Sequence, residues 1–513
     1  MPLASRFSVP VVTVCLALVA SGLVIGAGSA TAAPVSSDPL VTLAAGSSPR
    51  SIAVGAGGEF FTANFGSSVV AAFTSDGVFE PLRSVPMPAG SHPIDVAVDS
   101  KGTVWSANID GHSVGSFVPG TVMLTVFDLG VGVGPEAVAV GPNDIVYTAN
   151  GSANTISKIE RMGAGFVTTA KFAELVGAQP LALAIDAAGD IYTANTNNGT
   201  VSKVSAVGRV IDVFAKLPAG GHPDAIAIDS HGMLYVADTD HDSVVKIDPS
   251  KPLATNIIAT YQLAAGAKPF GLTVDARDNV YVTNRATSTV DVIPDGATVA
   301  TTIQTMPVGS GLTGITVSPA NVLLTTSFAR AVVSSLDLTT VLTLTKPVAD
   351  VDLGASVSGS FTATGVDPLT FSSADLPAWL TLNPTTGAFT GTPPTSGPVS
   401  FSVVANSLVG ASNPVTVSFT VIGAAPTATP TPTSTPGQTT PPTTVPGTGG
   451  GGSTGGSAGG GSGSGSTSGR GGSTGSLAHT GADAGGAVGL VGSGLGLVAL
   501  GIVVGVRRRR RTV

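Results

Sequence analysis

The strongest constraint on the fold of this chain is a motif that recurs seven times in its first 340 residues. One copy reads PDAIAIDSHGMLYVADTDHDSVVKID, from Pro223 to Asp248. The copies follow one another at steps of 42 to 46 residues and begin at Pro49, Pro93, Pro135, Pro180, Pro223, Pro269 and Thr313, which replaces the proline. Each copy holds short apolar strands separated by turns rich in Asp, Asn and Gly. This period, with four strands per copy, predicts an all-β chain whose copies are the blades of a β-propeller.

The segment before the first copy predicts how the ring closes. VTLAAGSSP, from Val41 to Pro49, matches YQLAAGAKP, from Tyr261 to Pro269, where a copy ends and the next begins. It reads as a fourth strand with no blade before it, whereas the last copy supplies three strands only. Pairing the two removes two exposed sheet edges. We therefore predict a seven-bladed propeller over residues 38–340, with six or eight blades as the alternatives.

Two copies carry a family resemblance. YVTN…STVDVI, from Tyr281 to Ile293, and YVAD…DSVVKI, from Tyr235 to Ile247, resemble YVTN-type and NHL-type surface propellers. The blades are also similar to those of virginiamycin B lyases, whose chemistry depends on His and a metal-binding Glu. Where that family often has Glu at the strand end, this chain has Asn64, Asn108, Asn150, Asn195, Asp238, Asn284 and Ser327. No histidine follows the repeat proline, so we expect that the chain is not an enzyme.

These strand-end residues are also candidate ligand contacts. Symmetry between the blades would place in one ring the residues Asn64, Asn108, Asn150, Asn195, Asp238 and Asn284. A ring of amides can hydrogen-bond a sugar or a peptide. The competing interpretation is that each amide caps its own turn, which is a common role of Asn.

One loop has part of a calcium-binding pattern. Asp238, Asp240 and Asp242 form DTDHD, but Ser243 stands where an EF-hand requires Gly, and Pro249 where it requires Glu. We therefore expect no metal site and no cofactor, with the three aspartates as weak candidates and calcium as the ion concerned. His92 and His222, each directly before a repeat proline, are interpreted as loop residues.

The N-terminus has the pattern of a secretory signal peptide over residues 1–32. Arg6 precedes an apolar run from Val9 to Ile25, and Ala30-Thr31-Ala32 supplies the cleavage site. The single cysteine, Cys15, lies within the apolar run and would be removed with it. The mature protein would then have no thiol or disulfide chemistry.

A second domain is predicted over residues 342–422. Its segment LPAWLTLNPTTGAFTGTP, from Leu376 to Pro393, resembles the dystroglycan-type cadherin-like, or Ig-like, domains of bacterial surface proteins. The resemblance implies a β-sandwich, in which Trp379 and Leu380 suit the core and Gly387 suits a turn. Cadherin relatives bind calcium through acidic clusters, whereas this segment has few acidic residues.

The C-terminal part has the organisation of a wall-anchored protein. Residues 423–476 are rich first in Pro and Thr, then in Gly and Ser, which predicts a disordered stalk. There follow an apolar segment over residues 484–506, long enough to span a membrane as one helix, and a basic cytoplasmic tail over residues 507–513. Between stalk and span lies the motif LAHTG, formed by Leu477, Ala478, His479, Thr480 and Gly481.

This order resembles an LPxTG-like sortase sorting signal, in the LAxTG form associated with class E sortases of Gram-positive actinobacteria. The resemblance implies cleavage after Thr480 and attachment to cell-wall peptidoglycan. A plain tail anchor is the alternative interpretation.

Composition completes the prediction of function. Charged residues make up 11% of the chain and the net charge is −8, with no basic patch for nucleic acid. We predict a secreted, cell-wall-anchored surface protein whose propeller binds an extracellular ligand or partner in adhesion or recognition. The alternatives are an extracellular propeller enzyme of lyase or lactonase type and a passive surface-layer or spacer protein.

Overall fold

The computed structural model describes residues 35–36, 39–121 and 123–423. Several predicted segments therefore lie outside the described residues: the signal peptide, the stalk beyond Gly423, the LAHTG motif, the apolar span and the basic tail. Within the described ranges, no helix has the length and apolar character needed to cross a membrane. The described chain is built from strands, with two short 3-10 turns at Pro142–Asp144 and Thr239–His241.

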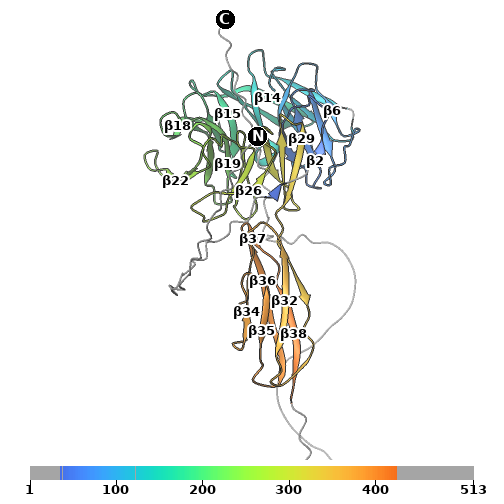
Figure 1. Ribbon diagram of the computed structural model, residues 1–513. Helices are drawn as coiled ribbons and strands as arrows, with labels where there is room; N and C mark the ends of the chain where they lie inside the picture. Colours follow the sequence, from blue (N-terminus) through green and yellow to red (C-terminus); the bar gives the residue numbers. More distant parts are fainter. Residues whose placement is uncertain (1–34, 37–38, 122, 424–513) are drawn as a thin grey trace, which may run out of the picture. The chain divides into compact units, whose positions relative to one another are not determined.

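In the described residues, seven sheets of four antiparallel strands, one of them extended by a fifth, parallel strand, form the first domain and are arranged around a common axis (Figure 1). Blade one consists of β3 (Pro49–Val54), β4 (Phe60–Asn64), β5 (Val69–Phe73) and β6 (Val85–Pro86). Blade two consists of β7 (Pro93–Val98), β8 (Val104–Asn108), β9 (Ser113–Phe117) and β10 (Leu124–Asp128). Blade three consists of β11 (Pro135–Val140), β12 (Val146–Asn150), β13 (Thr155–Met162) and β14 (Gly165–Glu174). The next two consist of β15 (Pro180–Ile185), β16 (Ile191–Asn195), β17 (Thr200–Val204) and β18 (Val210–Lys216); and β19 (Pro223–Ile228), β20 (Leu234–Asp238), β21 (Ser243–Ile247) and β22 (Ile257–Gln262).

The last two blades also take strands from the N-terminal segment. Blade six consists of β23 (Pro269–Val274), β24 (Val280–Asn284), β25 (Thr289–Ile293) and β26 (Thr301–Thr305), with β1 (Val35–Ser36) added in parallel to β26. Blade seven consists of β27 (Leu312–Val317), β28 (Val322–Ser327), β29 (Val332–Asp337) and β2 (Pro39–Thr42).

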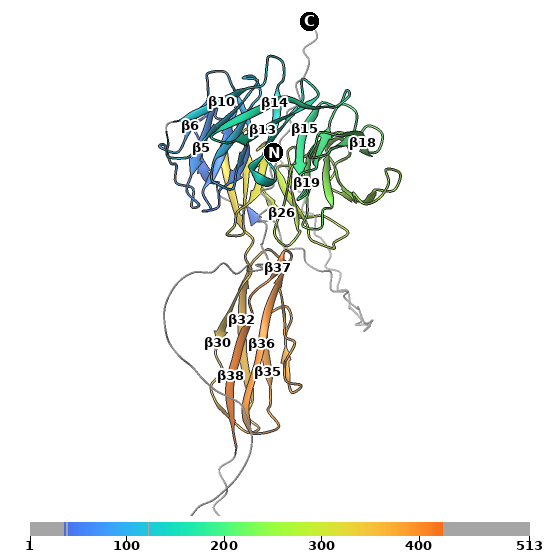
Figure 2. The ribbon, with the colours of Figure 1, turned by 180° about the vertical axis from the view of Figure 1, so that it is seen from behind.

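The burial of each strand follows from its place in the blade. β7 and β8 are buried along their whole length because neighbouring blades cover both faces. The outer strand β14 alternates between exposed and half-buried residues, since one of its faces meets solvent. Outer strands such as β6, β10 and β18 lie at the rim of the ring (Figure 2).

The predicted closure is confirmed. β2 pairs antiparallel with β29, with Val41 opposite Val333, and the Leu43 N–H donates to the Ala331 carbonyl at 2.8 Å. The two strands lie side by side in Figure 1. The seven-bladed count is therefore correct, and the alternatives of six or eight blades are wrong.

The start of the seventh copy was predicted one residue too late. Leu312 pairs with Ser327, just as Pro269 pairs with Asn284, so Leu312 and not Thr313 takes the place of the repeat proline. Thr313 occupies the next place, and its Oγ1 lies 3.0 Å from the Pro49 carbonyl oxygen of the first blade.

The second domain is a β-sandwich of two sheets. One sheet contains β30 (Val341–Lys346), β32 (Val357–Thr364), β35 (Ala388–Gly391) and β34 (Leu380–Leu382). The other contains β31 (Val351–Asp352), β38 (Val415–Ile422), β36 (Gly397–Ser407) and β33 (Thr370–Ser372), with β37 (Gly410–Ala411) on β36.

Aromatic side chains fill the space between the two sheets. Phe389 packs edge-on against Phe401 with ring centroids 5.3 Å apart, Leu380 is buried, and Trp379 lies half-buried against Phe419. Gly387 has φ +67°, and a Cβ there would lie 2.7 Å from the Phe361 carbonyl oxygen, so the turn requires glycine. The interpretation of Leu380 as a core residue and of Gly387 as a turn residue is confirmed.

One buried carboxyl group in the propeller gives a testable pH dependence. Asp95, on β7, is fully buried, and its Oδ2 accepts a hydrogen bond from the Val138 N–H of the next blade at 2.9 Å. Burial raises the pKa of Asp95 from 3.8 to about 7. Between these values the folded state holds a proton that the unfolded state releases, so stability falls as pH rises through this window.

We expect Asp95→Asn to remove this loss, because the amide keeps an acceptor for Val138 and cannot ionise. The difference in pKa corresponds to at most about 4 kcal/mol of unfolding free energy above pH 7. Denaturant unfolding at pH 5 and pH 8 should show a smaller pH effect in Asp95→Asn than in the parent, while the exposed turn variant Asp76→Asn keeps the parent's profile. Equal pH effects in the parent and Asp95→Asn would contradict this role.

Candidate functional site

In every blade, the innermost strand has a β-bulge directly after its first residue. A bulge leaves one residue without a partner in the neighbouring strand and changes the direction of its side chain. The residues at this place, which we call the axial layer, are all buried and comprise Arg50, Ile94, Glu136, Leu181, Asp224, Phe270 and Thr313. Three of the seven carry a charge, which is costly in a buried position unless the charge has a partner or a use.

The charges of the axial layer act on one another across the ring. Arg50, from blade one, interacts electrostatically with Glu136 of blade three and with Arg285, which follows β24 in blade six. Arg285 in turn interacts with Asp224 of blade five. The blades surround a common axis, and Arg50 interacts with residues of blades on both sides of its own. We infer that its side chain extends toward this axis. Two guanidinium groups and two carboxylates from four blades therefore interact electrostatically.

Arg50 is held between aromatic rings. Its guanidinium carbon lies 4.0 Å from the centroid of Phe328 and 5.2 Å from that of Phe65. The residue is 5% exposed, and neither Nε nor Nη1 has a hydrogen-bond partner among the described residues. Burial, together with the repulsion from Arg285, lowers the pKa of Arg50 to about 10, although Glu136 opposes the change.

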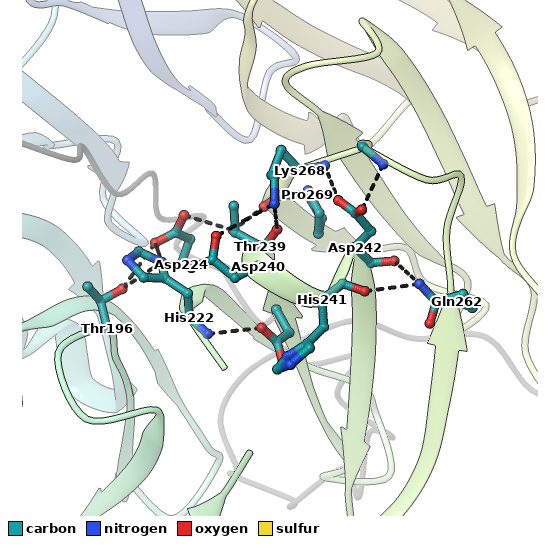
Figure 3. A network of polar contacts seen from close by, with 12 residues as sticks. Thr196, His222, Asp224, Thr239, Asp240, His241, Asp242, Gln262, Lys268 and Pro269 are labelled. Atoms are coloured by element: carbon teal, nitrogen blue, oxygen red, sulfur yellow. Dashed lines mark hydrogen bonds and ion pairs between the residues drawn. The ribbon is translucent and has the colours of Figure 1, made fainter. Parts of the chain in front are cut away.

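Asp224 is surrounded by donors from neighbouring loops (Figure 3). Thr196 Oγ1 lies 3.1 Å from Oδ1, Thr239 Oγ1 lies 2.8 Å from Oδ2, and His222 Nδ1 lies 3.0 Å from Oδ1. The two threonine hydroxyls also lie within 2.7 Å of the Pro223 and Pro269 carbonyl oxygens. Blades four, five and six are thus joined at this carboxylate, whose orientation is fixed.

The three aspartates of DTDHD do not form a joint metal site. Asp238 is buried and accepts hydrogen bonds from the His222 N–H at 2.9 Å and from His241 Nδ1 at 2.7 Å, which raises the pKa of His241. Asp242 accepts the backbone N–H groups of Gly266 and Lys268 (Figure 3). In the described part of the chain, no group of three His, Cys, Asp or Glu side chains is placed to hold a metal ion.

His92 and His222 lie apart and belong to different contacts. His92 Nδ1 lies 2.7 Å from Asp110 Oδ2, and its ring stacks on Phe65. His222, by contrast, contacts Asp224. The interpretation of both histidines as loop residues agrees with these positions.

The structure places the six residues of the predicted amide ring in buried positions. Asn150 is fully buried, and its Nδ2 donates to Thr155 Oγ1 at 3.0 Å and Ser157 Oγ at 2.7 Å, within its own blade. The same pattern recurs at Asn195, and the ring positions as a whole, Asn64, Asn108, Asn150, Asn195, Asp238 and Asn284, are at most 3% exposed. The side-chain amides of Asn108, Asn150, Asn195 and Asn284 thus tie the second strand of a blade to the third.

The axial layer is not among the sites predicted from the sequence. The signal was present as Arg50, Glu136 and Asp224, which stand directly after a repeat proline where other copies have Ile94, Leu181 or Phe270. A charge at a position that is apolar in related copies indicates a local use for that charge.

Comparisons with known proteins agree with this architecture. Residues 32–293 match the model of the virginiamycin B lyase family, and residues 338–422 match that of the "Putative Ig domain" family. A streptogramin B lyase structure is similar to this chain at 15% identity and a TM-score of 0.51, covering 57% of this chain and 95% of its own. Virginiamycin B lyase from Staphylococcus aureus gives 14% identity and a TM-score of 0.51, covering 57% and 97%.

A third similar structure is described as a complex with a ligand. It is a catalytically inactive variant of the Staphylococcus aureus virginiamycin B lyase with quinupristin, at 15% identity and a TM-score of 0.51, covering 58% of this chain and 98% of its own. No curated protein matches this chain. At these identities, the likeness to solved structures shows the fold of the propeller.

Proposed function

The chain belongs to the virginiamycin B lyase family, and we propose that its propeller binds an extracellular ligand at the axial layer. In this proposal the propeller releases the ligand chemically unchanged. The observation that carries this proposal is a group of interacting charges formed by three buried residues, Arg50, Glu136 and Asp224, and the half-buried Arg285. Buried charges usually cost stability, and where they gather at one site they indicate function. Blades that served as a scaffold alone would need no charge at these places.

The donor set of the axial layer does not suit a metal ion. The Asp224 carboxylate already contacts Thr196, Thr239 and His222. The guanidinium groups of Arg50 and Arg285 would also repel a cation. The His and metal-binding Glu on which the lyase chemistry depends have no counterparts at the compared positions. These features support recognition without conversion.

One contact favours the enzymatic alternative. His222 Nδ1 lies 3.0 Å from Asp224 Oδ1, an arrangement in which a carboxylate orients an imidazole for proton transfer. A lyase or lactonase that used this pair would need no metal for that step.

The proposal includes display at the cell surface. The signal peptide over residues 1–32, the stalk over residues 423–476 and the LAHTG motif support export, followed by attachment to peptidoglycan by a class E sortase. The Ig-like domain and the stalk would then hold the propeller away from the wall.

We expect Asp224→Asn to weaken ligand binding at least about tenfold, because the amide disturbs a carboxylate held by three neighbours while preserving its volume. Glycan and peptide arrays probed with the full chain should give hits that this variant loses. Asp212→Asn, on the outer strand β18, is the matched control and should keep every hit.

The proposal fails if the parent binds nothing on either array, or if Asp224→Asn retains its hits. Chromatography of quinupristin after incubation with the full chain should show it unchanged. Conversion that disappears in His222→Gln would establish the enzymatic alternative.

A further inference from the structure

The axial layer contains a guanidinium whose hydrogen bonds the propeller does not complete. We propose that the ligand of the axial layer carries a carboxylate beside an apolar group. Arg50, assisted by Arg285, recognises this carboxylate. This inference rests on the proposed function. The chemical class is therefore an organic monoanion, which a small acid, a peptide C-terminus or an acidic sugar can supply.

Within the described residues, two nitrogen atoms of the Arg50 guanidinium are buried without an acceptor for their N–H groups. Phe328 at 4.0 Å and Phe65 at 5.2 Å occupy its neighbourhood as aromatic partners, which contact a guanidinium through its faces. The N–H groups of a guanidinium point outward in its plane, and Nε and Nη1 have no hydrogen-bond partner within the described residues. A carboxylate can accept a hydrogen bond from Nε or from Nη1, each of which lies beside Nη2 in a pair of donors that matches a carboxylate.

Arg285 adds a second positive charge from blade six. Its guanidinium lies 5.0 Å from the ring centroid of Phe270, and its pKa is lowered by burial. Its charge also lowers the pKa of Arg50. Two cations that repel each other are both stabilised when an anion binds near them.

The other residues around Arg50 favour an anion with a single charge and an apolar part. Glu136 and Asp224 balance the charges of Arg50 and Arg285, so a dianion such as phosphate would meet two carboxylates as well as two guanidinium groups. A monoanion is the charge that this balance tolerates best. Ile94, Leu181 and Phe270 are buried in the same layer and provide apolar contacts for the rest of the ligand.

The test compares acids with their uncharged counterparts on the full chain by isothermal titration calorimetry. The pairs are 3-phenylpropionate with 3-phenylpropanamide, acetyl-Ala-Ala-Phe with its C-terminal amide, and glucuronate with glucose. We expect the acid of at least one pair to bind at least about tenfold more tightly than its partner. The pair that responds identifies the source of the carboxylate.

Arg50→Gln should remove this preference, and Arg50→Lys should lose most of it because an ammonium lacks the planar pair of donors. Arg161→Gln is the matched control, since Arg161 also lies over a phenylalanine ring, Phe166 at 4.5 Å, but is exposed in an outer hairpin of blade three. Arg285→Gln should weaken the acid several-fold, and it provides a second variant if Arg50→Gln fails to fold.

The inference is overturned if no acid binds, if acid and uncharged partner bind equally to the parent, or if Arg161→Gln has the effect expected of Arg50→Gln. Array hits that depend on Asp224 but are indifferent to a carboxylate would overturn this inference alone and leave the proposed function intact. The comparison of each acid with its uncharged partner is made on the parent protein. It therefore tests the preference for a carboxylate even if no variant folds.

Discussion

Deletion of residues 34–47 is expected to lower the melting temperature of the propeller by about 10 °C or more, because blade seven loses its outer strand β2. Val41 of this strand packs in a cluster with Ile52, Phe60 and Val333, so the deletion also opens the contact between blades one and seven. Two unpaired edges would be exposed, one on β29 and one on β26, where β1 pairs in parallel.

The measurement is thermal unfolding followed by circular dichroism, with a deletion of equal length in the stalk, residues 449–462, as the control. The stalk deletion should leave the melting temperature unchanged. A cooperative transition of the 34–47 deletion at the parent's temperature would show that the closing strand does not stabilise the ring.

Replacement of Thr480 by Ala is expected to move nearly all of the protein from the cell-wall fraction to the membrane fraction. In the proposed reaction, the sortase cysteine sulfur attacks the Thr480 carbonyl carbon, a thioester forms, and the peptide bond to Gly481 breaks. The new amine of Gly481 leaves with the apolar span. An amine of the wall then attacks the thioester and releases the cysteine.

Fractionation and mass spectrometry of protein released by wall hydrolases check this prediction. Parent cells should yield a C-terminal peptide that ends at Thr480 and carries a wall fragment. Thr474→Ala, in the stalk just before the motif, is the matched control and should remain in the wall. Uncut chains that extend to Val513 as the main species in parent cells would instead support the plain tail anchor.

The described structure agrees with the sequence wherever the evidence was a repeated pattern. The blade count followed from seven copies of one motif, and the closing strand followed from the likeness of Val41–Pro49 to Tyr261–Pro269. The turn at Gly387 followed from local backbone chemistry. Strand period, turn residues and repeat length are properties of neighbouring residues, so they can be predicted before the chain is folded.

The tertiary structure alone decided which polar side chains face the axis. Asn150 and Asn195 stand at strand ends in a symmetric series, yet hydroxyls of the next strand in the same blade accept their side-chain N–H groups. Arg50 acquires Phe328 and Arg285 as neighbours only when the ring closes, because they come from blades seven and six. Sequence symmetry predicts that equivalent residues share a level of the ring, but the direction of each side chain depends on bulges and on partners distant in the chain.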